Sequence, residues 1–420
     1  MGTTVLDATT LWTGFAAQSW GKAPVALNTV PLATPSEAFQ ALITMCDAYR
    51  AGEPEPTSEN LRLAVQHRKL EADVHRHLPS AEDGSGADYA ARLERDLHSR
   101  TFFIYARDIQ VFSPLLWDRA RDVLAALFDR IGIPAGHVEL ELFFGRYEFT
   151  TGGIHRESCS NLHCVLDGHK RMHIWPKDAW TDSSAMNKGE AYAGYLDATD
   201  IGRHIAGATT LDGRSGDILY WPAEAWHVGE APELTLCMNI AIYMEGQPSD
   251  LAAGIVSKLV SARLGRDARL ISYPMSQSRS SGGEILPEPI EKTLLSLRQM
   301  GSDSGLAGAV AAEWLKRKTG FGFEKPPRRA PSRGVPVGAT IRGSRKYRVL
   351  WMETDDEELV YAANGHASTA PCRPGVIGLL ERLNRGEPAQ VSDLLRDDPS
   401  PNELQAIVDE LLTMRAVTLC

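Results

Sequence analysis

The chain has 420 residues, of which 43% are hydrophobic and 23% charged, as is usual for a soluble globular protein of two or three domains. The formal net charge of −10 argues against a nucleic-acid partner, because proteins that bind phosphate usually carry a basic surface. Apolar runs stay well short of the roughly 18 residues that span a bilayer, so we expect no membrane partner. The scattered cysteines predict free thiols and a cytoplasmic protein.

The first part of the chain, residues 1–137, is predicted to be mostly helical. Apolar residues recur there at helical spacing between Gly and Ser signals. Ser36 is the expected N-cap of the first long helix. We expect helices over 36–52, 59–78, 84–100 and 115–132, and a short strand over 101–109.

From residue 138 to residue 246 the pattern changes to that of strands. The stretch 138–149 alternates, and 161–176 reads as a strand, a turn and a second strand. Many short strands at close spacing favour a sandwich or barrel. We therefore predict a mainly β core with helices around it, formed as a double-stranded β-helix barrel of the jelly-roll or cupin kind.

Helical spacing returns in residues 247–323, where helices are expected over 250–265, 289–300 and 307–320 around a polar loop, 276–284. Residues 324–340 are rich in Pro, Arg and Gly and predict a linker. The last part, 341–420, is predicted to be a winged-helix-like domain. We expect strands over 345–353, 357–365 and 417–420, and helices over 373–386, 391–398 and 400–416, the last with a capping box from Ser400 to Glu403.

Three residues of the β region are candidate metal ligands. His155 and Glu157 are two apart, and about seventy residues later Asp217 and Pro222 frame a turn, a strand and a turn that lead to His227. Two histidines and one carboxylate form the facial set of non-haem iron sites, which leaves positions open for substrate and oxygen. Zinc and manganese also suit these ligands. A bare His-x-Glu is common, and the second element in the required order favours the metal site.

Other polar residues surround this motif. Alternation in an unbroken strand would place Asn161 and His163 on the face of the ligands. We expect structural roles for His163, His169 and His173, since no second element matches them. Cys159 is expected to be a small buried residue.

The segment 155–176, HRESCSNLHCVLDGHKRMHIWP, resembles the jumonji-C family of Fe(II)/2-oxoglutarate oxygenases, and particularly its protein-hydroxylase branch. In that branch an Asn follows the first metal histidine by six residues and a Lys follows it by fifteen, within Gly-x-Lys-Arg. These positions are Asn161 and Lys170 here. Glu157 stands where Asp is commoner in the family. The resemblance implies a cofactor set of Fe(II) and 2-oxoglutarate, with O2 as co-substrate.

The resemblance also implies roles for individual residues. Lys170 would pair with the distal carboxylate of 2-oxoglutarate, and Asn161 would hold its metal-proximal end. Asn239 matches an Asn that the family carries after the distal histidine, although it lies three residues closer to that histidine here. A hydroxyl before the first histidine often assists, and Thr151, or Thr150 beside it, is the counterpart. Without the resemblance, a surface lysine in a hairpin turn would be the simpler interpretation of Lys170.

The order of the parts is similar to that of the ribosomal oxygenases, which place a helical dimerisation region and a winged helix after the barrel. This implies a homodimer that hydroxylates a side chain of a peptide or protein. Two alternatives remain: an oxygenase for a small metabolite, and a metal-binding cupin without oxygenase activity. The tail is acidic, with Asp355, Asp356 and Asp397 among its charges, and would repel phosphate. It also resembles domains that recognise precursor peptides, and a purely packing role is equally open.

Overall fold

The computed structural model describes residues 8–29, 31–66, 68–180, 186–189, 192–196, 201–245, 248–264, 288–300, 305–354, 357–396 and 398–420. The predicted polar loop 276–284 and the tail charges Asp355, Asp356 and Asp397 lie outside these residues. The chain divides into two compact units, Met1–Glu245 with Phe321–Arg328, and Gly246–Gly320 with Arg329–Cys420. The predicted division into five parts is finer than this and stays a prediction.

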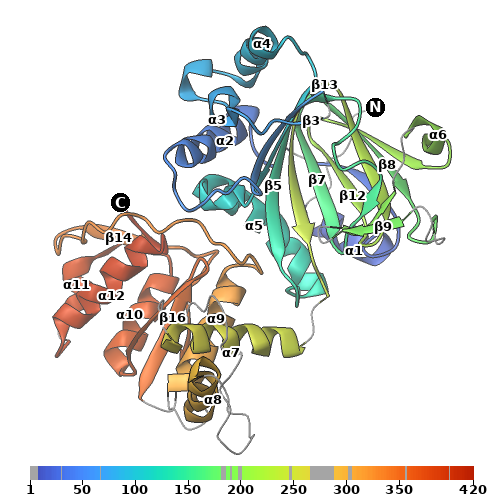
Figure 1. The fold of residues 1–420 in the computed structure, drawn as a ribbon. Coiled ribbons are helices and arrows are strands. Elements are labelled where there is room, and N and C mark those ends of the chain that lie inside the picture. Colours follow the sequence, from blue (N-terminus) through green and yellow to red (C-terminus); the bar gives the residue numbers. More distant parts are fainter. Residues whose placement is uncertain are drawn as a thin grey trace, which may run out of the picture. The chain divides into compact units, whose positions relative to one another are not determined.

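The first unit combines a large antiparallel sheet with helices (Figure 1). Its helices and helical turns are α1 Ala8–Gln18, α2 Pro35–Arg50, α3 Val74–His77, η1 Ala81–Asp83, α4 Gly86–Leu97, η2 Ile109–Val111, α5 Pro114–Ile131 and α6 Gly202–Ile205. Its strands are β1 Val25–Asn28, β2 Leu61–Val65, β3 Arg68–Lys69, β4 Phe102–Arg107, β5 Val138–Tyr147, β6 His155–Arg156, β7 Ser160–Asp167, β8 His169–Trp175, β9 Met186–Gly189, β10 Tyr192–Leu196, β11 Thr209–Arg214, β12 Asp217–Trp221 and β13 Trp226–Ile242.

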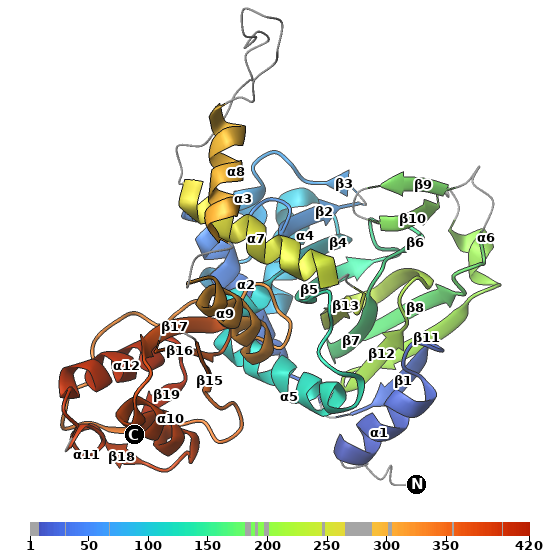
Figure 2. The same ribbon diagram turned by 90° about the horizontal axis from the view of Figure 1, so that it is seen from below.

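One long strand, β13, joins two sets of strands. Its second half pairs with β5 on one side and β7 on the other, within the order β1-β12-β7-β13-β5-β4-β2-β3. Its first half pairs with β8 and, at His227, with β6. Figure 2 shows β8 beside β11 and β9 beside β10, which complete the second set. A large antiparallel sheet is thus present between residues 138 and 242, where a mainly β core was expected.

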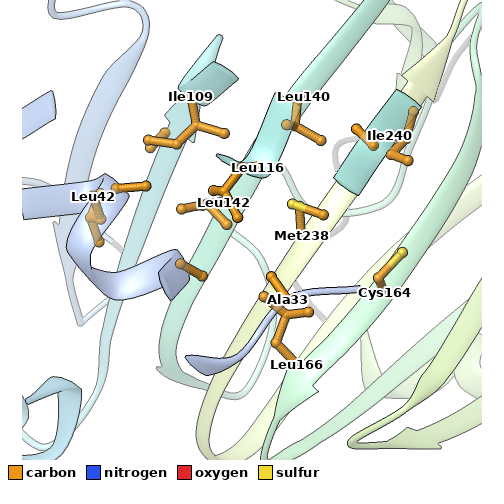
Figure 3. Close-up of a cluster of buried hydrophobic side chains, with 14 of the residues drawn as sticks. Ala33, Leu42, Ile109, Leu116, Leu140, Leu142, Cys164, Leu166, Met238 and Ile240 are labelled. Atoms are coloured by element: carbon orange, nitrogen blue, oxygen red, sulfur yellow. The ribbon is translucent and has the colours of Figure 1, made fainter. Parts of the chain in front are cut away.

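Alternation divides the central strands into an apolar face and a polar face. Side chains of α2, η2 and α5, such as Leu42, Ile109 and Leu116, meet one face of β5, β13 and β7 in a single core (Figure 3). The strand residues on this face are Val138, Leu140, Leu142, Phe144, Leu162, Cys164, Leu166, Leu236, Met238, Ile240 and Ile242. Their neighbours in sequence, Glu139, Glu141, Asn161, His163 and Asn239, line a cavity on the opposite face.

The helix predicted over residues 59–78 is wrong. This stretch forms β2, β3 and the single turn α3. Its charge and its Leu and Ala content suit a helix, but Leu61 and Leu63 are buried while Arg62 is exposed, which is the period of a strand. Pairing of β2 with β4 along its whole length overrides the local helical preference.

Helix α2 has its N-cap two residues earlier than predicted, at Thr34 rather than Ser36. The Thr34 hydroxyl accepts from the backbone N–H of Glu37 at 3.2 Å, and the Glu37 carboxylate accepts from the backbone N–H of Thr34 at 2.7 Å. Pro35 follows as the first helical residue, where its missing N–H costs nothing. Ser36 is exposed within the first turn.

This cap predicts a difference between two neighbouring substitutions. Thr34→Ala should destabilise the protein by about 1 kcal/mol, because the capping box loses its acceptor. Ser36→Ala, the matched control, should change the free energy of unfolding by less than about 0.5 kcal/mol. Urea denaturation followed by circular dichroism measures both. An equal loss of stability in the two variants would contradict the assignment of the cap.

The second unit contains three helices followed by two small antiparallel sheets and three further helices (Figure 1). Its helices are α7 Pro248–Leu264, α8 Glu288–Met300, α9 Gly305–Thr319, α10 Pro374–Asn384, α11 Val391–Leu395 and α12 Pro401–Thr413. Its strands are β14 Thr340–Gly343, β15 Leu350–Glu353, β16 Glu358–Ala363, β17 His366–Pro371, β18 Ala389–Gln390 and β19 Val417–Leu419. The sheets have the orders β15-β16-β17 and β18-β14-β19, and the predicted tail strands and helices are present.

Helix α9 belongs with the tail. Ala311 and Leu315 of α9 form one buried cluster with Val360 and Ala362 of β16, so α9 covers one face of the sheet β15-β16-β17. The other face packs against a larger core that includes α10 and α12.

The capping box predicted from Ser400 to Glu403 does not form, because the Ser400 side chain makes no capping hydrogen bond. The Glu403 carboxylate is held instead by Arg373, at 2.7 Å from Nη2. Arg373 also binds Asp398, so one guanidinium joins the start of α10 to the start of α12.

Among the helices of the described residues, none is both long enough and apolar enough to cross a membrane.

Candidate metal centre

The three predicted ligands come together on the polar side of the sheet. His155 in β6 and His227 in β13 are register partners, so the backbone sets their side chains next to each other. Their ring centroids lie 4.4 Å apart. With Glu157 they offer three ligand atoms that all lie within 4.8 Å of one another. Among the residues that the structure describes, this is the one group of His, Cys, Asp and Glu with such an arrangement.

Backbone carbonyl groups determine which nitrogen each histidine presents. His155 Nδ1 lies 2.9 Å from the carbonyl oxygen of Gly153, and His227 Nδ1 lies 3.0 Å from that of Ala225. A carbonyl only accepts, so each Nδ1 must carry the hydrogen. The lone pair of each Nε2 is therefore directed toward the site, which is the usual arrangement of histidines that bind metals.

Glu157 lies just beyond the end of β6, because the strand is not continuous as the alternation argument assumed. β6 ends at Arg156, and β7 begins at Ser160. Glu157 Oε1 is 3.8 Å from His155 Nε2, and Oε2 is 3.7 Å from His227 Nε2. These separations leave room for an ion that contacts all three groups. Burial raises the pKa of Glu157 and lowers that of His227, as expected for charge removed from water.

Lys170 extends into the same cavity from β8. The side chain is only 1% exposed, and Nζ donates to the hydroxyl of Tyr147 at 2.8 Å. Among the described residues no carboxylate is ion-paired with it, and burial lowers the pKa of Lys170 to about 8. A buried ammonium without a carboxylate partner is costly, so the position suits an anionic ligand.

Two glycines lie near Lys170, one in the turn before it and one beside its ammonium. Gly168 turns the chain from β7 to β8 with φ of +80°, and a Cβ there would lie 2.4 Å from the carbonyl oxygen of Leu234. Gly229 in β13 faces the lysine, and a Cβ at this residue would lie 2.5 Å from Lys170 Nζ and 2.9 Å from Met172 Sδ. Any larger residue at position 229 would displace the ammonium.

A chain of hydrogen bonds connects the two predicted asparagines with a carboxyl group that the sequence did not single out. Asn239 Nδ2 donates to Asn161 Oδ1 at 2.8 Å and to Glu141 Oε2 at 2.7 Å. Tyr105 Oη hydrogen-bonds Glu141 Oε1 on the other side. Asn161 Nδ2 has only long contacts, 3.4 Å each to the carbonyl oxygen and Sγ of Cys159. One donor of Asn161 is thus available to a ligand.

The predicted threonines both line the cavity, but they differ in burial. Thr151 is exposed, while the hydroxyl oxygen of Thr150 is buried without a hydrogen-bond partner. Thr150 N donates to the carbonyl oxygen of Gly229 at 2.9 Å, which holds the loop after β5 against β13. Thr150 is therefore the better-placed hydroxyl of the two.

Two of the three neighbouring histidines are bound on the face away from the cavity. His169 Nε2 lies 2.8 Å from Asp212, and His173 lies 2.7 Å from Glu230 and 2.9 Å from Thr210. These contacts agree with the structural roles expected for them.

The third, His163, lines the cavity instead. It is buried beside Asn239 and Trp221, and neither ring nitrogen makes a hydrogen bond of good geometry. Burial lowers the pKa of His163, so its imidazole is neutral. Sequence reasoning missed this residue, although the alternation that includes Asn161 pointed to it.

The cavity has a volume of about 570 Å³ and reaches from the three ligands to the open side of the sheet. Trp221, Met172 and Phe143 contribute apolar walls. At its inner end the buried polar atoms without hydrogen-bond partners include Thr150 Oγ1, Trp221 Nε1 and Asn239 Oδ1. The donor set fits a divalent metal ion that keeps open positions, and the buried ammonium fits an organic acid beside it.

Charged residues surround the other end of the cavity. Glu139 lies 3.6 Å from Arg107 and 3.5 Å from His137, and the His137 ring stacks on Tyr243 at 4.2 Å between centroids. Sequence analysis missed these residues, and only Glu139 lies in the segment 138–149, whose alternation was noted. This end is wide enough and polar enough to admit part of a second molecule.

Comparison with known proteins adds the fold. No protein-family model and no curated protein matches the sequence. Among solved structures, one matches the fold of this chain over nearly its whole length. This structure is that of E. coli YcfD. It matches with a TM-score of 0.50 and 15% identity, and the alignment covers 97% of this chain and 98% of YcfD.

Two further structures of the same E. coli protein also match. One describes YcfD as a ribosomal oxygenase and aligns with a TM-score of 0.49 at 14% identity. The other contains cobalt and 2-oxoglutarate and aligns with a TM-score of 0.46 at 15% identity. Both alignments cover 97% of this chain and 98% of YcfD. At this level of identity the comparison establishes the fold alone.

Proposed function

We propose that the protein is an Fe(II)/2-oxoglutarate-dependent dioxygenase that hydroxylates an amino-acid side chain of a peptide or protein. One observation carries the proposal: three metal-type ligands and a buried lysine without a carboxylate partner open onto the same cavity. A cupin that binds a metal ion for another purpose has no use for a buried ammonium at that position. The fold shared with YcfD supports the same conclusion.

The residues divide into two groups by role. His155, Glu157 and His227 hold the iron through Nε2, a carboxylate oxygen and Nε2. Lys170 binds the distal carboxylate of 2-oxoglutarate, and the metal-proximal end is held by Asn161 with the hydroxyl groups of Thr151 and Thr150, while Asn239 contributes through its hydrogen bond to Asn161. Iron and 2-oxoglutarate together supply the oxidising power to insert one oxygen atom of O2 into a C–H bond.

The protein contributes binding, orientation and exclusion of water. The carbonyl groups of Gly153 and Ala225 keep both imidazoles in the ligating tautomer. Trp221 packs 5.0 Å from His227 between ring centroids and shields the inner end of the cavity from solvent. The charged outer end, with Arg107, Glu139 and His137, is the side from which a substrate side chain would reach the metal.

The shape of the site and the fold support the proposed class of substrate. The cavity of about 570 Å³ exceeds what the small acid alone needs, and it is open on the side of β4 and β5. YcfD, which shares the fold, is described as a ribosomal oxygenase, and this favours a protein substrate. An oxygenase for a small metabolite is the second candidate, because the same opening would admit one.

The finer architecture is part of the proposal. We infer that the sheet of residues 138–246 closes into a double-stranded β-helix, since β13 pairs with strands of both sets. The sheet β15-β16-β17 with α10, α11 and α12 supports a winged-helix-like domain in residues 341–420. Exposed apolar residues on α8 and α9, such as Leu295 and Trp314, support a homodimer, which sedimentation equilibrium can measure. A cytoplasmic location remains an expectation.

An anaerobic titration tests the proposed activity. Fe(II) and 2-oxoglutarate added together should produce a weak visible charge-transfer band that neither produces alone. Absence of this band in the folded, iron-loaded protein would refute the 2-oxoglutarate assignment. The alternative of a metal-binding cupin without oxygenase activity would then be favoured. If the band forms, mass spectrometry of candidate peptides and of metabolite extracts after exposure to air identifies which class gains one oxygen atom.

A further inference from the structure

Glu141 is a buried carboxyl group for which the proposed reaction names no role. It is 7% exposed, lies in the middle of β5 and faces the cavity. Burial, together with the charges of Glu139 and Glu157, raises the pKa of Glu141 to about 8. A buried carboxyl group lowers the stability of the fold unless hydrogen bonds compensate. The partners of Glu141 therefore indicate its role.

The two hydrogen bonds of Glu141 determine how the neighbouring amide must point. Glu141 Oε2 accepts from Asn239, so the NH2 group of Asn239, and not its oxygen, faces the carboxyl group. The same NH2 group donates its second hydrogen to Asn161 Oδ1. Asn161 must therefore turn its own NH2 group away from Asn239 and toward Cys159, in the cavity that the metal ligands also line.

This conclusion is the same for both forms of the carboxyl group. An ionised Glu141 only accepts, from Tyr105 at Oε1 and from Asn239 at Oε2. A protonated Glu141 can place its hydrogen on Oε1 and donate it to the Tyr105 oxygen. Oε2 then still accepts from Asn239, so the direction of the amide does not change.

We propose that Glu141 is a positioning residue, which fixes the side-chain amide of Asn239 and, through it, presents the NH2 group of Asn161 as a donor to the acid bound beside the metal. This inference rests on the proposed function for the identity of the acid. Without an acceptor at position 141, both amides are free to rotate. A rotated Asn161 would direct its oxygen at a carboxylate, which replaces attraction with repulsion.

The apo protein allows a test that needs no cofactor. In protein labelled with 15N only at asparagine, the side-chain NH2 signals of Asn239 and Asn161 should be sharp and exchange slowly with water. Glu141→Gln should preserve them, because the glutamine oxygen still accepts from Asn239 while its NH2 group meets the Tyr105 oxygen. Glu141→Met should speed exchange of the Asn239 NH2 group at least about tenfold, because one of its two acceptors is lost.

Binding of 2-oxoglutarate to the Mn(II)-loaded protein gives the second readout. We expect Glu141→Gln to stay within about threefold of wild type and Glu141→Met to bind about tenfold or more weakly, with Mn(II) affinity unchanged. If Glu141 acts through Asn239, Glu141→Met should add no further loss to Asn239→Leu. The double variant replaces both partners with apolar groups, so it should also fold better than Glu141→Met alone.

A matched control separates positioning from general stability. Asp83 is another buried carboxylate, bound by Arg92 at 2.6 Å and by Ser80 at 2.8 Å, and it lies outside the cavity. Asp83→Asn should lower the melting temperature and leave both asparagine signals and 2-oxoglutarate affinity unchanged.

The outcomes distinguish this inference from the proposed function. Unaltered asparagine exchange in Glu141→Met would overturn the positioning role, whatever the protein binds. An equal loss in Glu141→Gln and Glu141→Met would also overturn it, because the charge and not the acceptor would then matter. A wild-type protein with protected amides but no affinity for 2-oxoglutarate would refute the proposed function and leave the amide positioning intact.

Discussion

A protein in which alanine replaces His227 is expected to lose its divalent metal ion and all hydroxylation. The substitution leaves His155 and Glu157, two ligands that the small loop after β6 holds together, and removes the ligand that β13 supplies. Since loss of groups that merely orient a ligand lowers metal affinity about 10- to 100-fold, loss of the ligand itself should cost 100-fold or more. Calorimetric titration with Mn(II) measures the affinity, and circular dichroism verifies the fold.

His169→Gln is the matched control for this experiment. His169 is also buried in the sheet, but it hydrogen-bonds Asp212 on the face away from the cavity, and a glutamine can donate to the same carboxylate. The control should bind Mn(II) as wild type does. Wild-type affinity in a folded His227→Ala protein would show that the three residues are not the metal site.

Replacement of Lys170 with methionine should separate the acid from the metal. Methionine fills nearly the same volume between Tyr147 and Gly229 but carries no charge. The affinity for 2-oxoglutarate should fall about 100- to 1,000-fold, the usual consequence of breaking a buried ion pair. Mn(II) affinity should not change. Competition calorimetry on the Mn(II)-loaded protein measures the loss.

The same substitution should have the opposite effect on stability without ligand. Among the residues that the structure describes, the Lys170 ammonium has the Tyr147 hydroxyl as its one hydrogen-bond partner, and burial lowers the pKa of Lys170 from 10.5 to about 8. At pH 7 the folded protein therefore keeps a buried charge that the unfolded chain would hydrate. Relief of this cost should raise the free energy of unfolding of the apo protein by about 1–3 kcal/mol.

The pH dependence of binding follows from the same group. Below pH 8 the ammonium is already charged, and the affinity of the wild type for 2-oxoglutarate should vary little. Above pH 8 the lysine must take up a proton to bind the carboxylate, so the apparent dissociation constant should rise up to about tenfold per pH unit. This slope should vanish in Lys170→Met.

Lys325→Met serves as the control for the lysine experiments. Lys325 is partly exposed and ion-paired with Glu55 and Asp108 at 3.0 Å each, outside the cavity. The Lys325→Met substitution should lower the stability of the apo protein slightly and leave 2-oxoglutarate binding intact. A Lys170→Met protein that binds 2-oxoglutarate as wild type does would remove the lysine from the site.

The metal ligands and Lys170 were accessible from the sequence because their spacing is local. His155 and Glu157 lie on one short stretch, and Asn161 and Lys170 lie on strands β7 and β8, which follow each other in the chain and are joined by the turn at Gly168. His227 followed from the turn, strand and turn before it. Alternation in the segment 138–149 also predicted a strand there, and β5 Val138–Tyr147 is present.

What the sequence missed depends on contacts between distant strands. Glu141 meets Asn239 only because β5 and β13 pair in one register, which no local pattern specifies. A structural role was expected for His163. The structure shows instead that its ring nitrogens lie buried beside Trp221 and Asn239 without hydrogen-bond partners among the described residues, which no local pattern reveals. The helix predicted over 59–78 failed for the same reason, since pairing of β2 with β4 decided its structure. Pro35 is a typical first helical residue and so marks Thr34 as the cap, but the prediction placed the cap at Ser36.

The length of β13 has a consequence for how the protein folds. This single strand carries His227 near its start and Asn239 near its end, and it pairs with β5, β6, β7 and β8. Because these partners precede it by tens of residues, the site forms only after the most distant contacts of the sheet are made. A chain with β13 undocked has two of the three ligands. A metal ion that needs all three ligands would therefore bind tightly only to chains in which β13 has already joined the sheet.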